Sequence, residues 1–249
     1  VYLCQFSRNI AKLKAGGILC SNTMYFYLTL SDFFHHKSYQ SGGAVQIDGT
    51  DIKSQAVISQ INFTSNTATT EGAALYIASA IDISLSDIIF IENKAHHTAG
   101  ALYVFLTEDL SSVIYISKCS FIKNLADQKG AALVISGVKE VHMNDSNIED
   151  SSNANVIFLH GTLLSIKNVT FSTNGVDSYS IDSENILVAL IVNLRFFCPY
   201  YAYLTKIAPQ AVGKCNQLSN CYTTEFRYRC MKCTETSYTV FQNFWNVSK

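Results

Sequence analysis

The chain has 249 residues, of which 48% are hydrophobic and 12% aromatic, so it can bury a sizeable core and is not intrinsically disordered. Only 15% of its residues are charged and the formal net charge is −1, which leaves no basic field to attract nucleic acid. The longest apolar run, 186–192, is far shorter than the roughly 20 residues of a membrane-spanning helix, so we predict no membrane-spanning segment here.

An internal repeat organises the chain as far as about Asn174. Each copy has a Phe, an Asn three residues later, and then a short run of small residues that leads into an apolar stretch. The three clearest copies start at Phe63, Phe90 and Phe121 and reach "EGAALYI", "TAGALYV" and "KGAALVI". The first residues, "VYLCQF", match "ISKCSF", which ends at Phe121, so Val1 lies inside a copy of the repeat. We therefore expect the chain to be a fragment. Weaker copies bring the total to seven and start at Phe6, at Phe33 or Phe34, at Ile148 and at Phe171. With Phe34 as the second start, the intervals are 28, 29, 27, 31, 27 and 23 residues.

The pattern of apolar residues inside each copy predicts β-strands. After the small residues, Leu75 and Ile77 fall on one face and Tyr76 on the other, and the later copies repeat this alternation. A period of two is typical of a strand, and no helix-period segment interrupts the copies. Turns of 23 to 31 residues that contain only strands predict an all-β parallel β-helix, or solenoid, of about seven rungs over residues 1–195.

The repeated residues have structural roles in such a solenoid. We expect each Phe to stack on the Phe of the next rung, each Asn to bond to the equivalent amides above and below, and Gly or Ala to permit a backbone bend. The Asn column is cleanest through Asn66, Asn93 and Asn124 and is interrupted at Lys37 and Ser151. We therefore predict that the second and sixth rungs are irregular.

These motifs resemble a known repeat. "GGAV" at 42–45, "GAAL" at 72–75 and 130–133, and Phe-x-x-Asn at 63, 90 and 121 are similar to the paired GGA(I/L/V) and FxxN repeats of chlamydial polymorphic membrane proteins and of similar protist surface proteins. The resemblance covers roughly residues 1–175. It implies a right-handed parallel β-helix that is displayed outside the cell, often in adhesion.

The eight cysteines fall into two groups. Cys4 and Cys119 share an inward column but lie four rungs apart, about 19 Å at strand spacing, which is too far for a disulfide. We assign Cys20 to the outward column and expect it to be unpaired within this sequence or paired with a cysteine upstream of it.

We expect residues 196–249 to form a small disulfide-rich tail. Its Cys230, Cys233 and Tyr238 match a C-x-x-C followed by an aromatic residue and so resemble the start of a growth-factor-receptor-type or ephrin-receptor-type cysteine-rich module. Disulfides are favoured among the five cysteines of this tail, which are Cys198, Cys215, Cys221, Cys230 and Cys233. The alternative is a zinc site formed by the last four of them.

Sequons and cysteines together favour an extracellular location. Structural disulfides form in the oxidising compartments through which secreted proteins pass. Four N-x-S/T sequons are candidate glycosylation sites in such a protein: Asn62, Asn144, Asn168 and Asn246. We therefore predict an extracellular or cell-surface glycoprotein.

No arrangement of residues favours catalysis. A carbohydrate-active β-helix enzyme needs clustered carboxylates on adjacent rungs, but the column three residues before the Phe places Lys118 between Asp87 and Asp145, which favours a structural charge ladder. The histidine pairs at 35–36 and 96–97 fall at different offsets from their Phe. We interpret them as solvated turn residues and predict no metal site and no cofactor.

An outward-facing column of the strand after the small residues is the candidate binding face. It contains Gln46, Tyr76, Tyr103 and Phe158, and contiguous exposed apolar surface marks contact sites. The alternative is that the tail, a connector or "NILVALIV" at 185–192 covers this column or caps the end of the solenoid.

The function predicted from these observations is non-enzymatic. We expect a surface or secreted β-helix that acts in adhesion or as a structural stalk and binds a protein or glycan at a cell surface, or other copies of itself. The alternatives are a carbohydrate-active β-helix enzyme, either a polysaccharide lyase or a hydrolase, and a subunit of an extracellular filament.

Overall fold

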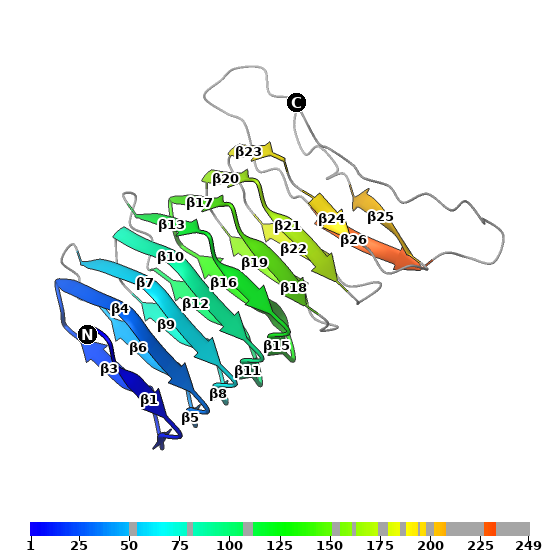
Figure 1. Cartoon of the computed structure of the whole chain (residues 1–249). Coiled ribbons are helices and arrows are strands. Elements are labelled where there is room, and N and C mark those ends of the chain that lie inside the picture. Colours follow the sequence, from blue (N-terminus) through cyan, green and yellow to red (C-terminus); the bar gives the residue numbers. More distant parts are fainter. Residues whose placement is uncertain are drawn as a thin grey trace.

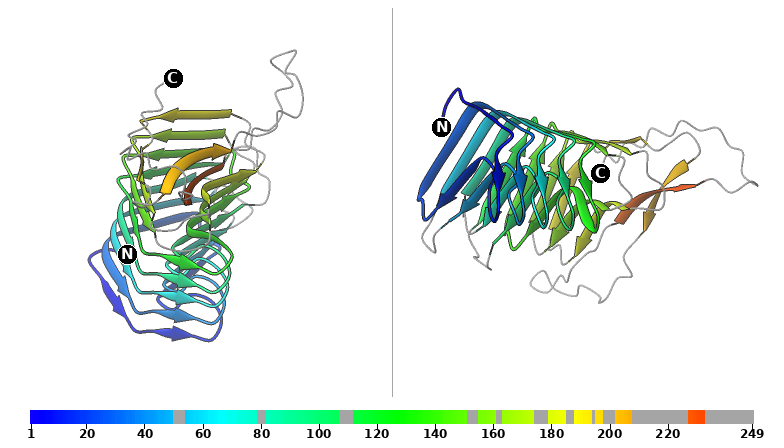
Figure 2. Two further views of the ribbon diagram at one scale, coloured as in Figure 1. Left: turned by 90° about the vertical axis from the view of Figure 1, so that its right-hand side faces the viewer. Right: turned by 90° about the horizontal axis from the view of Figure 1, so that it is seen from below.

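The computed structural model of the protein consists of β-strands joined by turns. The described residues contain no helix, which confirms the all-β prediction, and thus no helix able to cross a membrane. Successive turns of the chain stack along one axis and form an elongated solenoid (Figure 1, Figure 2). The structure describes residues 1–49, 54–78, 82–106, 112–150, 155–160, 163–173, 179–184, 188–193, 195–197, 202–207 and 227–232.

Three sheets run along the solenoid. Sheet A has 12 strands: β1 (Gln5–Ser7), β4 (Tyr25–Phe34), β7 (Gln55–Thr64), β10 (Asp82–Ile91), β13 (Val113–Ser117), β14 (Ser120–Ile122), β17 (Glu140–Asn144), β18 (Asn147–Asp150), β20 (Leu163–Lys167), β21 (Thr170–Thr173), β23 (Val188–Val192) and β24 (Arg195–Phe197). Sheet B has five: β2 (Ile10–Ala11), β5 (Lys37–Ser38), β8 (Thr67–Ala68), β11 (Lys94–Ala95) and β15 (Leu125–Ala126). Sheet C has nine: β3 (Ile18–Ser21), β6 (Val45–Asp48), β9 (Leu75–Ala78), β12 (Leu102–Phe105), β16 (Lys129–Ser136), β19 (Asn155–His160), β22 (Tyr179–Glu184), β25 (Ala202–Ile207) and β26 (Arg227–Lys232).

Parallel, in-register pairing connects each turn to the next. In sheet A, Phe63 lies opposite Phe33 in the turn before it and opposite Phe90 in the turn after it. The Phe of the second copy is therefore Phe33 and not Phe34, because Phe34 pairs with Thr64 outside the core column. The strands of all seven predicted copies pair one after another in sheet A, from β1 to β21. Strands of all three sheets occur together in five successive turns, because sheet B ends at β15 in the described residues while sheets A and C continue.

A column of phenylalanine rings occupies the middle of the core and confirms the predicted stacking. The rings of five successive turns stack with centroid separations of 4.7 to 5.2 Å: Phe6, Phe33, Phe63, Phe90 and Phe121. All except Phe6 are fully buried within one continuous hydrophobic core. Removing such a ring leaves a cavity, so each buried Phe contributes about 3–5 kcal/mol to stability.

A ladder of buried asparagines runs beside the phenylalanines. The Asn66 side-chain amide donates to Asn93 Oδ1 at 2.9 Å and to the Phe33 carbonyl at 3.1 Å, and the Asn66 backbone N–H donates to the same Asn93 oxygen at 3.0 Å. Asn93 makes the equivalent bonds to Asn124 and to the Phe63 carbonyl. Each side chain thus satisfies backbone groups that a buried turn would otherwise leave unpaired, which confirms the predicted amide column.

A histidine continues this ladder at the position where the sequence predicted an interruption. With Phe33 in the Phe column, the residue three positions later is His36 and not Lys37. The His36 backbone N–H donates to Asn66 Oδ1 at 3.0 Å, and its Nδ1 accepts from the Asn9 backbone N–H at 3.2 Å. His36 is 1% exposed, so its prediction as a solvated residue is wrong. The other predicted interruption, Ser151, lies outside the described residues, and three histidines are exposed as predicted: His35, His96 and His97.

Left-handed residues form three stacked corners at which the chain turns. Their φ values lie between 49° and 62°, and the backbone N–H of many of these residues donates to the next turn, as from Ser65 to the Ile91 carbonyl at 2.9 Å. This conformation costs a non-glycine residue roughly 1–2 kcal/mol, and the repeated hydrogen bonds offset that cost. The corners consist of Leu3, Leu30, Gln60, Asp87, Lys118, Asp145, Asn168 and Asn193; of Arg8, His35, Ser65, Glu92 and Lys123; and of Ala15, Gly42, Gly72, Ala99 and Gly130.

The polar column in the first of these corners is not a charge ladder. In the described residues, no ion pair joins Lys118 to Asp87 or to Asp145 within 4.0 Å. The column is defined by its shared left-handed backbone, which leaves its side chains at the surface and lets oppositely charged residues follow one another without contact.

Parallel stacking continues through the stretch that we expected to cover or cap the solenoid. β23 pairs with β20, and β24 pairs with β21, so Val188–Val192 is a strand of a further turn. Sheet C ends differently, because β26 runs antiparallel to both β22 and β25. The boundary at 195–196 and the tail disulfides stay predictions, since most of the tail lies outside the described residues.

Replacing Asn93 with Ala tests the ladder. The change leaves the Phe63 carbonyl and the polar groups of Asn66 without their partner inside the protein. Because each buried unsatisfied group costs about 1–3 kcal/mol, we expect the free energy of unfolding to fall by about 2–5 kcal/mol in urea titrations followed by circular dichroism. Asn62→Ala is the matched control, since it removes one exposed bond to Asp32. Equal losses in both variants would contradict a special role for the buried ladder.

Candidate functional site

The strands of sheet C divide their side chains between the core and the outer surface. In-register pairing places Gln46, Tyr76 and Tyr103 in one outward column. Asp48 and Phe105 lie in the outward column two residues further along the strands. We call these five residues the outer face of sheet C, and they include three of the four residues predicted as a binding face.

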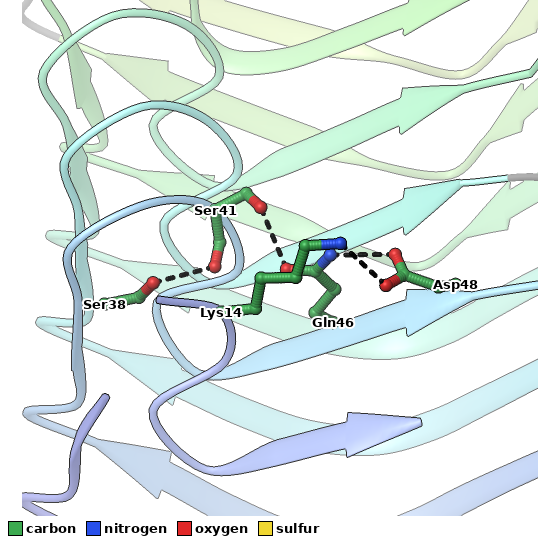
Figure 3. A network of polar contacts seen from close by, with 5 residues as sticks. All are labelled: Lys14, Ser38, Ser41, Gln46 and Asp48. Atoms are coloured by element: carbon green, nitrogen blue, oxygen red, sulfur yellow. Dashed lines mark hydrogen bonds and ion pairs between the residues drawn. The ribbon is translucent and has the colours of Figure 1, made fainter. Parts of the chain in front are cut away.

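A polar network fixes one end of this face (Figure 3). Gln46 Nε2 donates to Asp48 Oδ1 at 2.8 Å, and Ser41 Oγ donates to Gln46 Oε1 at 2.9 Å. Lys14 Nζ forms an ion pair with Asp48 Oδ2 at 3.1 Å, and Ser38 Oγ donates to the Ser41 carbonyl at 2.9 Å. Gln46 is 1% exposed, so it organises its neighbours and does not itself offer surface to a partner.

Tyr76 and Tyr103 form the centre of the face. Their rings stack with a centroid separation of 5.3 Å and an interplanar angle of 13°, and both residues are half-buried. Burial raises the pKa of Tyr103 to about 12, and Glu71 and Tyr76 add to this effect. Burial, followed by the charges of Glu71 and Asp48, also raises the pKa of Tyr76. Both phenols are therefore neutral at physiological pH and present a flat apolar ring with a hydrogen-bonding tip.

The third corner covers part of this column. Gly42 and Gly72 have φ of +61° and +58°. A Cβ added to Gly42 would lie 2.7 Å from Gln46 Cβ, and a Cβ added to Gly72 would lie 3.1 Å from Tyr103 Cβ. The glycine backbone therefore rests on the outward side chains, which explains why Gln46 is buried and the tyrosines are only half-exposed. Val134, the next residue of the column, is buried in the same way.

Phe105 extends the aromatic surface, and the sequence analysis missed it. It is 41% exposed and lies two residues after Tyr103 on the same side of β12. The alternation that selected Tyr103 also identifies Phe105, if the strand is followed one period further. Phe158 pairs with Val134 and so keeps its place in the outward column, while its side chain lies outside the described residues.

Cys20 lies on the inward side of sheet C and not on the outward side as predicted. It pairs with Ile47 and packs against the core, while Leu19 pairs with Gln46, because the alignment of this copy differs by one residue from our prediction. Cys4, Cys20 and Cys119 are free thiols in the part of the chain that the structure describes. In the same part of the chain, no group of three or more His, Cys, Asp or Glu residues is placed to hold a metal ion.

The sequons lie in different surroundings. Asn62 is exposed and donates to Asp32 Oδ1 at 2.8 Å, and Asn168 is exposed and donates to Asp145 Oδ1 at 2.8 Å. Asn144 is half-buried. Asn246 lies outside the described residues, as do Cys198, Cys215, Cys221 and Cys233 and the side chain of Cys230.

The Cys119 thiol is predicted to resist alkylation in the folded protein. Burial raises its pKa to about 12, so almost no reactive thiolate exists near neutral pH. We expect iodoacetamide to modify Cys119 at least about 100-fold more slowly in native protein than in urea, with peptide mass spectrometry as the measurement. Similar rates in the two conditions would show that the residue is accessible and that the core around it opens.

Comparisons with known proteins support the repeat assignment. Residues 60–78 match the model of the Chlamydia polymorphic membrane protein repeat, a segment that includes the end of β7, all of β8 and all of β9. The chain is 32% identical over 126 residues to the metabotropic glutamate receptor-like protein R of Dictyostelium discoideum, and the match covers 49% of this chain and 7% of that protein. The search of solved structures gave no significant match. The repeat match and the parallel solenoid together confirm the predicted resemblance to polymorphic membrane protein repeats, while the resemblance of the tail to a cysteine-rich module stays a prediction.

Proposed function

We propose that this chain is a non-enzymatic solenoid of the cell surface or extracellular space, and that the outer face of sheet C binds a protein or a glycan. The repeat at 60–78 supports a surface location, because it matches a repeat of polymorphic membrane proteins. The observation that carries the binding proposal is the stacked pair of Tyr76 and Tyr103 with Phe105 beside it. Adhesion is the activity that this combination supports best.

The strand register holds the aromatic rings in place before a partner binds. Tyr76 and Tyr103 stand on strands that are paired on both sides, and the ring stacking restricts their rotamers. Binding therefore costs little additional side-chain entropy. Rigid tyrosines of this kind are frequent energetic centres of interfaces, and they suit the C–H face of a sugar ring or an aliphatic side chain.

Charged groups border the aromatic centre. The Lys14–Asp48 ion pair lies at one end, and Glu71 is near enough to both tyrosines for its charge to raise their pKa values. Burial raises the pKa of Glu71 itself, while the nearby His97 lowers it. An apolar centre with a polar border of both charge signs is the usual composition of a binding interface.

The variants Tyr76→Ser and Tyr103→Ser test the binding face. Each removes one ring of the stacked pair, and we expect each to weaken binding of the chain to cells or to an immobilised glycan array by about tenfold or more. Tyr115→Ser is the matched control, because Tyr115 is an exposed tyrosine on sheet A and is expected to leave binding unchanged. Thermal unfolding of all three variants checks that the fold is retained.

Other outcomes of the same experiment point to other functions. Altered self-assembly of Tyr103→Ser, without a change in cell binding, would favour the filament-subunit alternative. Cleavage of a bound glycan by the wild-type chain, abolished in Asp48→Asn, would favour the carbohydrate-active enzyme. Unchanged binding and assembly in both tyrosine variants would overturn the proposal for this face.

A further inference from the structure

His36 replaces the ladder asparagine in the second turn. In the later turns, the asparagine Oδ1 accepts a backbone N–H from the preceding turn, and its Nδ2 donates to the Phe carbonyl of that turn. His36 reproduces only the first of these bonds, since its Nδ1 accepts from the Asn9 backbone N–H. The side chain at this ladder position therefore joins the first two turns through one acceptor atom.

The remaining ring nitrogen has no partner. His36 Nε2 is buried and makes no hydrogen bond. Because Nδ1 accepts a hydrogen bond, the neutral ring carries its hydrogen on Nε2. A buried donor without an acceptor is costly, which makes this the weakest of the described ladder positions.

Among the described residues, no carboxylate faces the His36 ring. The titratable group that acts on it is the neighbouring His35, whose charge disfavours protonation. Burial lowers the pKa of His36 below its ordinary value, and this effect exceeds the opposite influence of the Phe6 and Asn9 backbone groups. The Phe6 backbone is thus close to the ring, but Nε2 makes no hydrogen bond of acceptable geometry with it. The groups placed against His36 come from three turns and are Phe6, Asn9, Gly16, Phe33 and Asn66.

We propose that His36 makes the junction between the first and second turns acid-sensitive. Protonation adds a hydrogen to Nδ1, which removes the acceptor of the Asn9 N–H and leaves a buried cation without an anionic partner. Opening of the junction between residues 1–22 and the second turn allows the ring to hydrate. The turns that are joined by Asn66, Asn93 and Asn124 contain no titratable ladder group and stay closed.

The direction of the pH effect follows from proton linkage. The open state binds a proton near the ordinary histidine pKa of about 6.5, whereas the closed state binds it only at lower pH. The stability of the junction is therefore fully present above this value and decreases as the pH falls below it. Opening of this junction uncovers the edges of β4 and β6, and an uncovered strand edge can pair with another chain.

Hydrogen exchange across the junction tests the proposal. The amides of Arg8, Gly16 and Gly17 donate to the second turn and report on its opening. Between about pH 6.5 and about pH 5, we expect their protection factors, corrected for intrinsic exchange, to fall by up to about tenfold per pH unit. Amides that join later turns, such as those of Glu92 and Leu125, serve as the internal reference and should not change.

His36→Asn separates the proposed switch from general acid destabilisation. This variant restores the amide that the other turns use, so protection of the first turn should rise and lose its dependence on pH in this range. His35→Asn, at the exposed neighbouring position, should keep most of the wild-type dependence. A wild-type junction that does not respond to pH, or an equal response in His36→Asn, would overturn the proposal.

Discussion

Parallel stacking in register, one strand spacing apart, is the constraint on which this structure depends. It makes the equivalent residue of the next turn the nearest neighbour of most side chains, so each column must contain a group that packs on its own kind. Phenylalanine rings satisfy this requirement by stacking at 4.7 to 5.2 Å, and asparagines satisfy it because each amide is both donor and acceptor. The repeat in the sequence is the consequence of this rule.

The same rule determines where the chain tolerates unusual residues. Left-handed backbone is disfavoured for most residues, yet Lys118, Asp145 and Arg8 adopt it, because each corner residue donates to the turn beside it. A ladder position is less tolerant, because its side chain is buried and must serve two polar groups. His36 pairs with one of them through Nδ1, and its other ring nitrogen, Nε2, is buried without a hydrogen-bond partner.

The strands, the Phe column and the Asn ladder could be predicted from the sequence because they follow from periodicity and self-pairing. The errors come from features that periodicity does not determine. Adjacent Phe33 and Phe34 fit the pattern equally well, and a shift of one residue also reversed the face of Cys20. The burial of Gln46 depends on a corner that folds over its own strand, and alternation alone contains no information on such cover.

Side-chain stacking also operates on the outside of the solenoid, where no core requires it. Tyr76 stacks on Tyr103 in sheet C, and Tyr115 stacks on His142 in sheet A at 5.0 Å. A flat group in one turn thus lies against a flat group at the equivalent position of the next, although each outward stack is limited to two rings, as Gln46 and Val134 bound the tyrosine pair. Because inward columns already hold the backbone, changes in these outward stacks alter what the surface contacts without altering the core. This separation explains how a fold maintained by phenylalanine and asparagine can also present aromatic rings at its surface.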